Sequence, residues 1–472
     1  MIPGVPPQIT EEPVEQLEGV AVEPLATVAP TIDDPVLEAG ATGSLEVLRN
    51  RPFLALWLAQ ASTQIGGNMV LYGLTVEVYS LTNSTSAVSL LILSFLVPAV
   101  LLSAVAGVYV DRLDRRLILI VTNLLRAVMF ALLFFVGNSL IAILILNVGV
   151  STVTTFFAPA EASMIPVLVK RNQLLAANGI FTLTLNAAFA LGFALLGPLV
   201  VNLTSPQVLL LVVAAFYLLA MGLTITLPSA PPTAEEHGHG LAVHEASAAA
   251  ASTVGQLREG IAFIKDHRNI TWSLIYLGIT ASLIGVLGVV GPAFAYQALG
   301  LSPKDFVVIV LPLGIGVVTG ILFLNSYGKL MSRRRSIETG MILLGIFLAL
   351  LSAAGPITRF LQHVSSVSPI DVSSLVTLLS VVIVLAFLAG IAYASVAIPA
   401  QTQLQEDLPQ EVRGRVFGVL NMLISTASFL PIIIFGVIAD WVSTTAVVFV
   451  VGLAITVSGI LSAVVRRDVV RE

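Results

Sequence analysis

Arg126 is the residue that most directly suggests chemistry, because it lies near the middle of the apolar stretch Leu117–Val136. An arginine at the centre of a membrane helix costs roughly 2.5–3.5 kcal/mol on insertion scales. Asn123 comes about one helical turn earlier and shares the same face. The pair has two interpretations. In the first, the pair contacts substrate or takes part in proton coupling in a water-filled cavity. In the second, the arginine has a structural role and pairs with an acid or with helix carbonyls.

Three carboxylates lie within or near apolar stretches: Glu77, Glu161 and Asp440. Partial burial raises the pKa of a carboxyl group toward physiological pH, which is what a proton carrier needs. We place Glu77 and Asp440 near the outer ends of their stretches. Both are candidates for proton coupling, and both also fit the simpler role of an interfacial acid in contact with water.

The composition defines the elements that must position these side chains. Of the 472 residues, 57% are hydrophobic and 10% are charged, whereas soluble domains carry about 25% charged residues. Apolar runs of about 20 residues match a hydrocarbon core about 30 Å thick. Only helices and closed barrels satisfy their backbone hydrogen bonds in lipid, and continuous apolar runs exclude barrel strands.

We therefore expect an all-α membrane protein with twelve transmembrane helices in two pseudo-symmetric six-helix bundles. The expected spans are Phe53–Val78, Ala87–Val110, Leu117–Val136, Leu140–Ala158, Gly179–Val201, Val208–Leu227, Trp272–Tyr296, Phe306–Leu324, Ile337–Ala354, Ser374–Ile398, Val416–Ala439 and Thr445–Val465.

The regions between and around the spans give the domain plan. Residues 1–50 are acidic and proline-containing and lack the basic start and apolar stretch of a signal peptide, which predicts a disordered cytoplasmic tail. The two bundles are residues 51–227 and 272–465. Residues 228–271 form a central cytoplasmic loop with an amphipathic helix, and 466–472 a second cytoplasmic tail.

The basic residues predict the orientation. With both termini in the cytoplasm, nearly all of the 22 Lys and Arg residues lie on the cytoplasmic side, which is a strong positive-inside signal. The exceptions are Lys304 and Arg359 on the opposite side and Arg126 inside a span. The halves also look related, because similar stretches begin at Pro159 and Pro399, about half the chain apart.

The sharpest local motif is the loop between the second and third expected spans. It runs from Gly107 through Asp111, Arg112, Leu113 and Asp114 to Arg115 and Arg116. Gly107 allows close approach of helices, and Asp111 can accept hydrogen bonds at a neighbouring helix N-terminus, where the dipole favours negative charge. A general excess of basic residues on the cytoplasmic side would account for the arginines alone. The spacing of Gly107, Asp111 and the three arginines is more specific than that.

This loop resembles the signature loop of the major facilitator superfamily, and twelve spans with a long middle loop match that plan. Asp114 stands where the family usually has glycine, which resembles the branch of macrolide efflux proteins and the enterobactin exporter. Leu124–Ala127, Phe156–Ala160 and Ile165–Val169 resemble the same branch. In this branch an aspartate is more usual at the position of Asn123, and a neutral residue near Glu77.

The resemblance implies a latch between the halves. Asp111 would face the start of the eleventh span near Gly414, and Glu161 would pair with Arg112, Arg115 or Arg116. The basic loop Tyr327–Arg335 carries no Asp-Arg pair, so the latch is degenerate in the second half. Gly192 and Gly197-Pro198 partly match an exporter motif, although helix contacts through small residues would also explain them.

Absent motifs narrow the function. The sequence has no phosphate-binding loop, no cysteine and no nucleophile–histidine arrangement, so we expect neither an enzyme nor a bound cofactor. His237, His239 and His244 fit a flexible linker better than a metal site, and we predict no metal. A membrane potential of 100 mV supplies about 2.3 kcal/mol per charge, enough to drive transport.

The expected function is export of a small amphipathic compound by proton antiport with alternating access. Uptake of a nutrient or lipid-like solute, and a non-transporting membrane scaffold or receptor, are the alternatives. The expected partners are a small-molecule substrate, protons and membrane lipid, without nucleic acid, and the oligomeric state stays open. The expected location is the plasma membrane.

Overall fold

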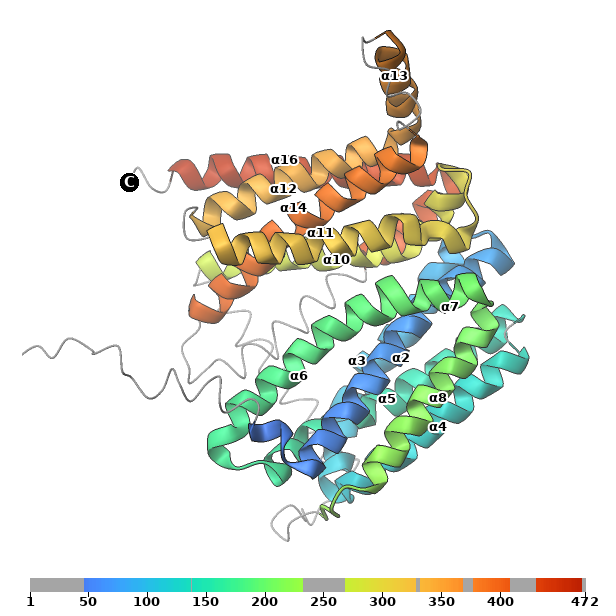
Figure 1. The fold of residues 1–472 in the computed structure, drawn as a ribbon, viewed down its shortest axis with the longest axis vertical. Helices are drawn as coiled ribbons and strands as arrows, with labels where there is room; N and C mark the ends of the chain where they lie inside the picture. The colour runs from blue at the N-terminus through green and yellow to red at the C-terminus, as the bar shows by residue number, and fades with distance from the viewer. Residues whose placement is uncertain are drawn as a thin grey trace, which may run out of the picture.

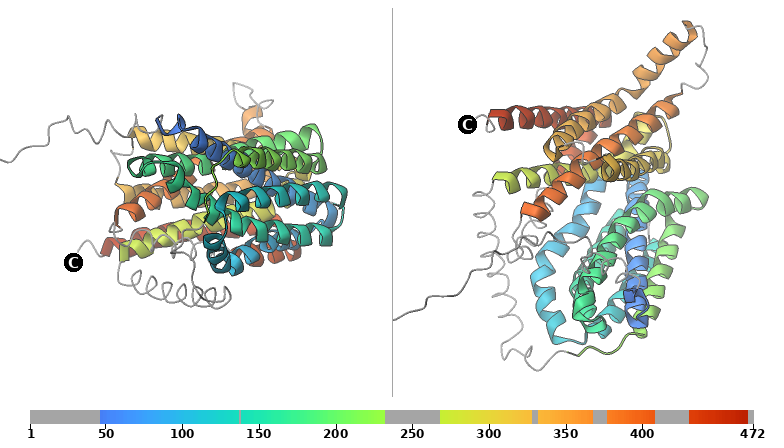
Figure 2. Two further views of the ribbon diagram at one scale, coloured as in Figure 1. Left: turned by 90° about the horizontal axis from the view of Figure 1, so that it is seen from below. Right: turned by 60° about the vertical axis from the view of Figure 1, so that its left-hand side comes forward.

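The computed structural model describes residues 46–136, 138–231, 268–327, 332–367, 377–407 and 430–468, and its regular elements there are helices. They form two bundles that follow each other along the chain (Figure 1). The bundles come together at one end, where α7 approaches the loop after α10 (Figures 1 and 2).

The first bundle contains the chain from Arg51 to Ile225. Its helices are α2 (Arg51–Thr82), α3 (Thr85–Arg112), α4 (Arg115–Val136), α5 (Leu140–Leu168), the short turn η1 (Arg171–Gln173), α6 (Leu174–Phe189), the π-helical segment η2 (Ala190–Leu196), α7 (Gly197–Leu203) and α8 (Pro206–Ile225).

The second bundle begins at Arg268. Its helices are α10 (Arg268–Gln297), the turn η4 (Pro303–Phe306), α11 (Val307–Tyr327), α12 (Arg333–Ser352), α13 (Ala354–Val367), α14 (Leu378–Asp407) and α16 (Thr444–Asp468). The apolar helix Leu430–Trp441 precedes α16.

Ten helices of the described residues are long and apolar enough to cross a membrane. Two further elements occupy the places of the first and eleventh expected spans. One is α2, which is interrupted by polar residues such as Gln60 and Asn68, and the other is Leu430–Trp441. The residues expected to form the start of the eleventh span, and the amphipathic helix of the central loop, lie outside the described residues.

Several helices of the first bundle begin at a residue that the sequence makes an N-cap. The side chains of Asn50, Ser84, Ser139 and Ser205 each accept a hydrogen bond from the backbone N–H three residues on. Short polar side chains favour this position because they satisfy an otherwise unpaired donor of the first turn. These caps explain why α3, α5 and α8 begin within about two residues of the predicted starts.

Polar side chains join the helices of the first bundle. The Asn147 side chain on α5 donates to Leu91 O at 3.0 Å and to Ser94 Oγ at 2.8 Å, both on α3. The Ser151 hydroxyl donates to Phe95 O one turn away. These hydrogen bonds form because lipid offers no hydrogen-bonding partner, so a polar group buried in the membrane must bond to protein.

Glycines allow close contacts between two pairs of helices in the second bundle. A Cβ added at Gly316 of α11 would lie 2.0 Å from Phe387 O on α14. A Cβ at Gly345 of α12 would lie 2.3 Å from Gly452 O on α16. Small residues let helix backbones approach closely in membranes, so these two interfaces depend on backbone proximity and not on side-chain bonds.

The two bundles touch at one end, which we call the closed end. There the Tyr72 hydroxyl donates to Lys304 O at 2.6 Å, and its ring stacks on Phe306 with centroids 4.8 Å apart. The Gln297 amide donates to the Tyr79 hydroxyl at 3.3 Å. Each hydrogen bond found between described residues of the two bundles lies at this end or within two turns of it.

Candidate functional site

Arg126 lies in the interior of the first bundle, where α4, α5 and α8 meet. Its side chain is 2% exposed. The guanidinium carbon lies 4.1 Å from the centroid of Phe157 on α5 and 4.6 Å from that of Tyr217 on α8. Aromatic faces attract a cation through the ring quadrupole, and more strongly where water is excluded. The bundle therefore holds this charge between two rings.

Hydrogen bonds to α4 itself complete the environment of Arg126. Its Nη2 donates to Asn123 Oδ1 at 2.7 Å, and its Nε donates to Thr122 O at 3.3 Å. Asn123 is 0% exposed. The structure thus brings together the two residues that the sequence placed on one face, and it adds helix carbonyl contact as well.

Glu161 lies farther into the membrane span than expected. The helix α5 continues to Leu168, ten residues beyond the predicted end at Ala158, so Glu161 is buried inside it and 7% exposed. Arg126 is the cation that acts on Glu161 electrostatically. This placement differs from the expected pairing of Glu161 with Arg112, Arg115 or Arg116 at the loop.

The cluster retains unused hydrogen-bonding capacity. Within the described part of the chain, Glu161 Oε1 and Asn123 Nδ2 are buried side-chain atoms without a hydrogen-bond partner. Buried polar groups without partners cost free energy, and in native proteins they often mark functional positions. We take Arg126, Asn123 and Glu161, with the rings of Phe157 and Tyr217, as the candidate site and call them the Arg126 cluster.

Glu77 lies near the closed end and belongs to a separate group. Its side chain is 5% exposed and accepts a hydrogen bond from Gln207 Nε2 at 2.7 Å. This bond connects the last turns of α2 to the first turn of α8. Glu77 is therefore buried, as proton coupling would require, but it has a partner within its own bundle.

Asp440 connects the two bundles. Its carboxylate accepts hydrogen bonds from Ser84 Oγ at 2.7 Å, Thr85 N at 2.7 Å and Ser86 N at 2.9 Å. These donors form the first turn of α3, where unpaired N–H groups and the helix dipole favour an anion. The structure thus gives Asp440 a helix-capping role across the bundle interface.

The signature loop places its two aspartates differently. Asp111 is exposed at the end of α3, and Gly107 lies in the same helix with open space where a Cβ would point. Asp114 instead accepts hydrogen bonds from Arg116 N at 2.8 Å and from the Ser229 hydroxyl. It links the start of α4 to the segment that follows α8. Gly414, the expected partner of Asp111, lies outside the described residues.

The pKa of Asp114 reflects these bonds. Partial burial alone would raise the pKa of its carboxyl group. Hydrogen bonds from Ser229, Ala230, Leu117 and Arg116 outweigh that effect and lower the pKa below its ordinary value. Donors that stabilise a carboxylate act in this direction, so Asp114 is held in its ionised form.

Sequence reasoning missed three contributors to these sites: Asp114, Phe157 and Tyr217. Asp114 is followed two and three residues later by the N–H groups it caps, which is the pattern of a helix N-cap. No local pattern distinguishes Phe157 or Tyr217 from other aromatic residues of apolar spans. Their role depends on how α5 and α8 rotate toward α4.

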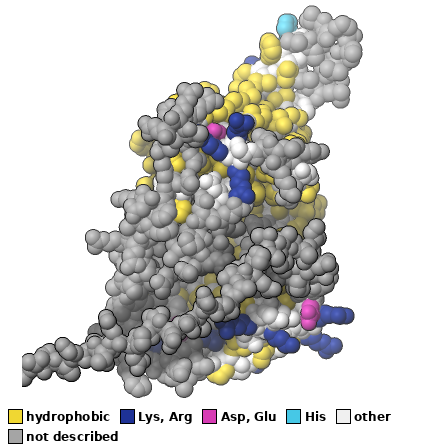
Figure 3. Space-filling view, turned by 90° about the vertical axis from the view of Figure 1, so that its left-hand side faces the viewer, with side chains coloured by type: hydrophobic (Ala, Val, Ile, Leu, Met, Phe, Trp, Pro, Cys, Tyr) yellow, Lys and Arg dark blue, Asp and Glu magenta, His cyan; other side chains and the backbone are white. Residues whose placement is uncertain are grey.

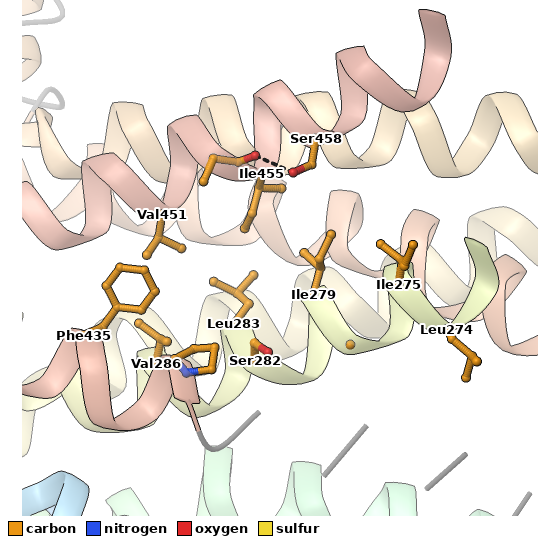
Figure 4. Close-up of a pocket in the computed structure, with 13 residues that line it drawn as sticks. Leu274, Ile275, Ile279, Ser282, Leu283, Val286, Phe435, Val451, Ile455 and Ser458 are labelled. Atoms are coloured by element: carbon orange, nitrogen blue, oxygen red, sulfur yellow. Dashed lines mark hydrogen bonds between the residues drawn. The ribbon is translucent and has the colours of Figure 1, made fainter. Parts of the chain in front are cut away.

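An apolar pocket of about 500 Å³ lies in the second bundle, between α10, the helix Leu430–Trp441 and α16 (Figure 4). Aliphatic side chains such as Leu283 and Ile455 line it together with Phe435 and the serines Ser282 and Ser458. None of the described residues that line it is charged. The pocket offers apolar contact but no titratable group.

Basic side chains gather at the end of the molecule opposite the closed end. Figure 3 shows that face, with described Lys and Arg side chains in two groups, one on each bundle. Within the described residues, no group of three His, Asp or Glu side chains could hold a metal ion. The histidines of the central loop lie outside those residues.

Comparisons with known proteins match this architecture. The family model described as Major Facilitator Superfamily matches residues 56–431. The uncharacterized MFS-type transporter YfiS of Bacillus subtilis (strain 168) is 24% identical over 440 residues, covering 89% of this chain and 95% of that protein. The multidrug efflux pump Tap of Mycolicibacterium fortuitum is 21% identical over 429 residues, covering 88% and 96%.

Solved structures share the fold at low sequence identity. The nucleoside transporter NupG superposes with a TM-score of 0.61 at 13% identity and covers 87% of this chain and 98% of its own. A bacterial homologue of the iron transporter ferroportin, in an inward-facing state, gives a TM-score of 0.58 at 12% identity with coverage of 87% and 98%.

Proposed function

Because this chain belongs to the major facilitator superfamily and is a multi-pass membrane transporter, we propose that it exports a small amphipathic compound in exchange for protons. The proposed location is the plasma membrane of a bacterium, with both termini in the cytoplasm. The similarity to a protein named as a multidrug efflux pump supports export. The transporter uses no catalytic residue and no bound cofactor.

The Arg126 cluster carries the proposal. A carboxyl group on α5 and a guanidinium on α4 lie buried in the interior of one bundle, with Glu161 Oε1 lacking a hydrogen-bond partner among the described residues. Proton binding at Glu161 removes its negative charge. Arg126 then keeps its contacts with Asn123 and with the rings of Phe157 and Tyr217. Proton release restores an attraction between α5 and α4. The protonation state of Glu161 thus changes how two spans of one bundle hold each other.

The closed end defines the state in which this exchange starts. In the predicted orientation it faces outward, so the contacts of Tyr72 with Lys304 and of Asp440 with α3 seal the outer side. Opening of those contacts is the outward step of alternating access. The signature loop would act at the opposite end, where Asp111 would latch onto the second bundle in the outward-open state.

Flux measurements with a dye test the proposal. Proteoliposomes containing the purified chain are loaded with ethidium as the probe, and flux is followed with and without an imposed pH gradient. We expect gradient-driven flux for the unmodified chain and for Glu77→Gln, whose carboxyl group lies outside the cluster. Glu161→Gln should lose the response to the gradient while it still exchanges ethidium down its own gradient.

Three other results would contradict the proposal. Gradient-driven flux that persists in Glu161→Gln would remove Glu161 from coupling. Ethidium movement in the opposite direction under the same gradient would indicate uptake. Absence of flux across a panel of cationic dyes and neutral solutes would indicate a scaffold or receptor.

A further inference from the structure

The helix α13 (Ala354–Val367) leaves the second bundle at the closed end, in a stretch where the sequence predicted only a loop after the ninth span. It follows α12 with Ala353 alone between them, yet it turns sharply and runs across the direction of α12 and α14 (Figures 1 and 2). A helix with this direction at the end of the spans is oriented to run along a membrane surface and not through it.

Apolar and polar residues of α13 lie on different faces. Ile357, Phe360 and Leu361 follow the spacing i, i+3, i+4, which places them on one face. Phe360 is 67% exposed and Leu361 39% exposed. Arg359 and Gln362 lie away from that face and are exposed. Contiguous exposed apolar surface of this kind marks a site of contact with a membrane or with another protein.

The apolar face of α13 borders a groove formed with the ends of α12 and α14. Ile357 and Leu361 line an apolar groove together with Leu350 at the end of α12 and with Val381 and Val384 near the start of α14. The span α14 begins at this end of the bundle. The face of α13 that lies against the first turns of α14 is therefore next to the part of α14 that would contact hydrocarbon. The surface of the groove is thus continuous with the lipid-facing side of the bundle.

We propose that α13 is an interfacial helix that docks on the lipid surface at the closed end. Phe360 and Leu361 insert among acyl chains, and Arg359 lies at the level of the headgroup phosphates. Three observations favour lipid as the occupant: α13 runs across the direction of the spans at their outer end, its apolar face borders an apolar groove formed with α12 and α14, and the opposite side carries a cation. Amphipathic helices of this kind bury their apolar face about 5–10 Å into the boundary.

Site-directed spin labelling tests this placement directly, because the chain has no native cysteine. Phe360→Cys and Leu361→Cys would report on the apolar face, and Gln362→Cys is the matched control on the other side of the same helix. Each nitroxide-labelled full-length chain is reconstituted in vesicles of phosphatidylethanolamine and phosphatidylglycerol. Collision rates with oxygen and with a water-soluble nickel chelate are then measured.

The labels on the apolar face should collide severalfold more often with oxygen than with the nickel chelate, and the label at position 362 should show the reverse preference. Equal access of nickel to all three labels would show that α13 extends into water, and this result would overturn the proposal. Shielding of labels 360 and 361 from both reagents, relieved by dilution with unlabelled protein, would identify a second copy of the chain as the occupant and would also overturn it.

Discussion

The carboxylate of Asp440 accepts two hydrogen bonds from Thr85, one from the backbone N–H at 2.7 Å and one from the hydroxyl at 2.5 Å. The oxygen of the same hydroxyl lies 2.6 Å from Gly436 O, so its single proton is shared between the two acceptors. Two residues 355 positions apart thus join the start of α3 to the end of the helix Leu430–Trp441. No other carboxylate among the described residues accepts hydrogen bonds from the other bundle.

Asp440→Ala should therefore shift the protein away from the state with a closed end. Loss of bonds to an exposed carboxylate costs about 1 kcal/mol after solvent screening, or about a fivefold change in population. Ser89→Cys is a suitable reporter, because Ser89 is 3% exposed and its hydroxyl donates to Ile432 O. Maleimide should label this cysteine about fivefold faster when Asp440 is replaced.

The control for that experiment is Asp305→Asn, which removes another carboxylate at the closed end. The described residues donate no hydrogen bond to its side chain, so labelling of the cysteine should stay at the rate of the parent chain. An unchanged labelling rate in Asp440→Ala would show that the other contacts between the bundles hold the closed end alone.

Tyr217→Leu should destabilise the first bundle through Arg126. The substitution removes one of the two rings that hold the guanidinium, and also the stacking of Tyr217 on Phe130 at 5.3 Å. The loss from the cation contact alone is about 2 kcal/mol at a desolvated site. Thermal unfolding in detergent should show a lower Tm for Tyr217→Leu, with a smaller decrease for Tyr217→Phe.

A double-mutant cycle separates the cation contact from packing. In a chain that already carries Arg126→Met, replacement of Tyr217 by leucine should cost less than it does in the parent chain. Equal costs in the two backgrounds would mean that Tyr217 acts through packing alone, because the coupling energy would then be zero.

Asp114→Asn should remove a stability contribution that depends on pH. Because hydrogen bonds lower the pKa of Asp114 in the folded protein, its carboxylate stabilises the fold above the unfolded pKa of about 4. That contribution is lost as the pH falls through the lower folded value. The Tm of the parent chain should fall below pH 4 more steeply than that of Asp114→Asn.

Asp111→Asn is the matched control for this pH series. It replaces the neighbouring exposed aspartate of the same loop and leaves the hydrogen bonds of Asp114 in place. Its Tm should follow that of the parent chain over the same pH range. Identical acid profiles for the parent chain and Asp114→Asn would instead show that the donors at α4 and Ser229 contribute no net stability.

Gly192→Ala should interfere with folding of the first bundle. The segment η2 brings Gly192 so close to α2 that a Cβ would lie 2.5 Å from Ile65 O. Overpacking of this kind costs roughly 1–3 kcal/mol. Gly222→Ala is the control, since nothing lies within 4 Å of a Cβ there. Size-exclusion chromatography should show a smaller monodisperse peak for Gly192→Ala only.

Hydropathy was sufficient to predict the helical membrane fold. Ten spans are found in the described residues, and the family match confirms the major facilitator fold. Boundaries were less predictable: a span counted by polarity ends before a charged residue, whereas α5 continues past the buried Glu161 to Leu168. The helix α13 was missed because its apolar residues are too few to resemble a span.

The candidate site was predictable only in part. Arg126 and Asn123 could be paired from spacing within one helix, and the structure shows their side chains in contact. The approach of Glu161 to this pair depends on the rotation of α5 against α4, which no local pattern encodes. Asp440 contacts the start of α3 across 355 positions of sequence, and such a contact follows only from the way the bundles assemble.

The different interfaces of the two bundles have a mechanical consequence. Asn147 joins α5 to α3 through a side chain that can rotate and exchange acceptors while the helices slide. Gly316 and Gly345 bring the backbones of neighbouring helices into direct contact, so these helices have little room to shift against each other. The pairs α11–α14 and α12–α16 would therefore each move as a rigid unit, whereas α3 and α5 could shift past each other if Asn147 re-formed its bonds at neighbouring acceptors.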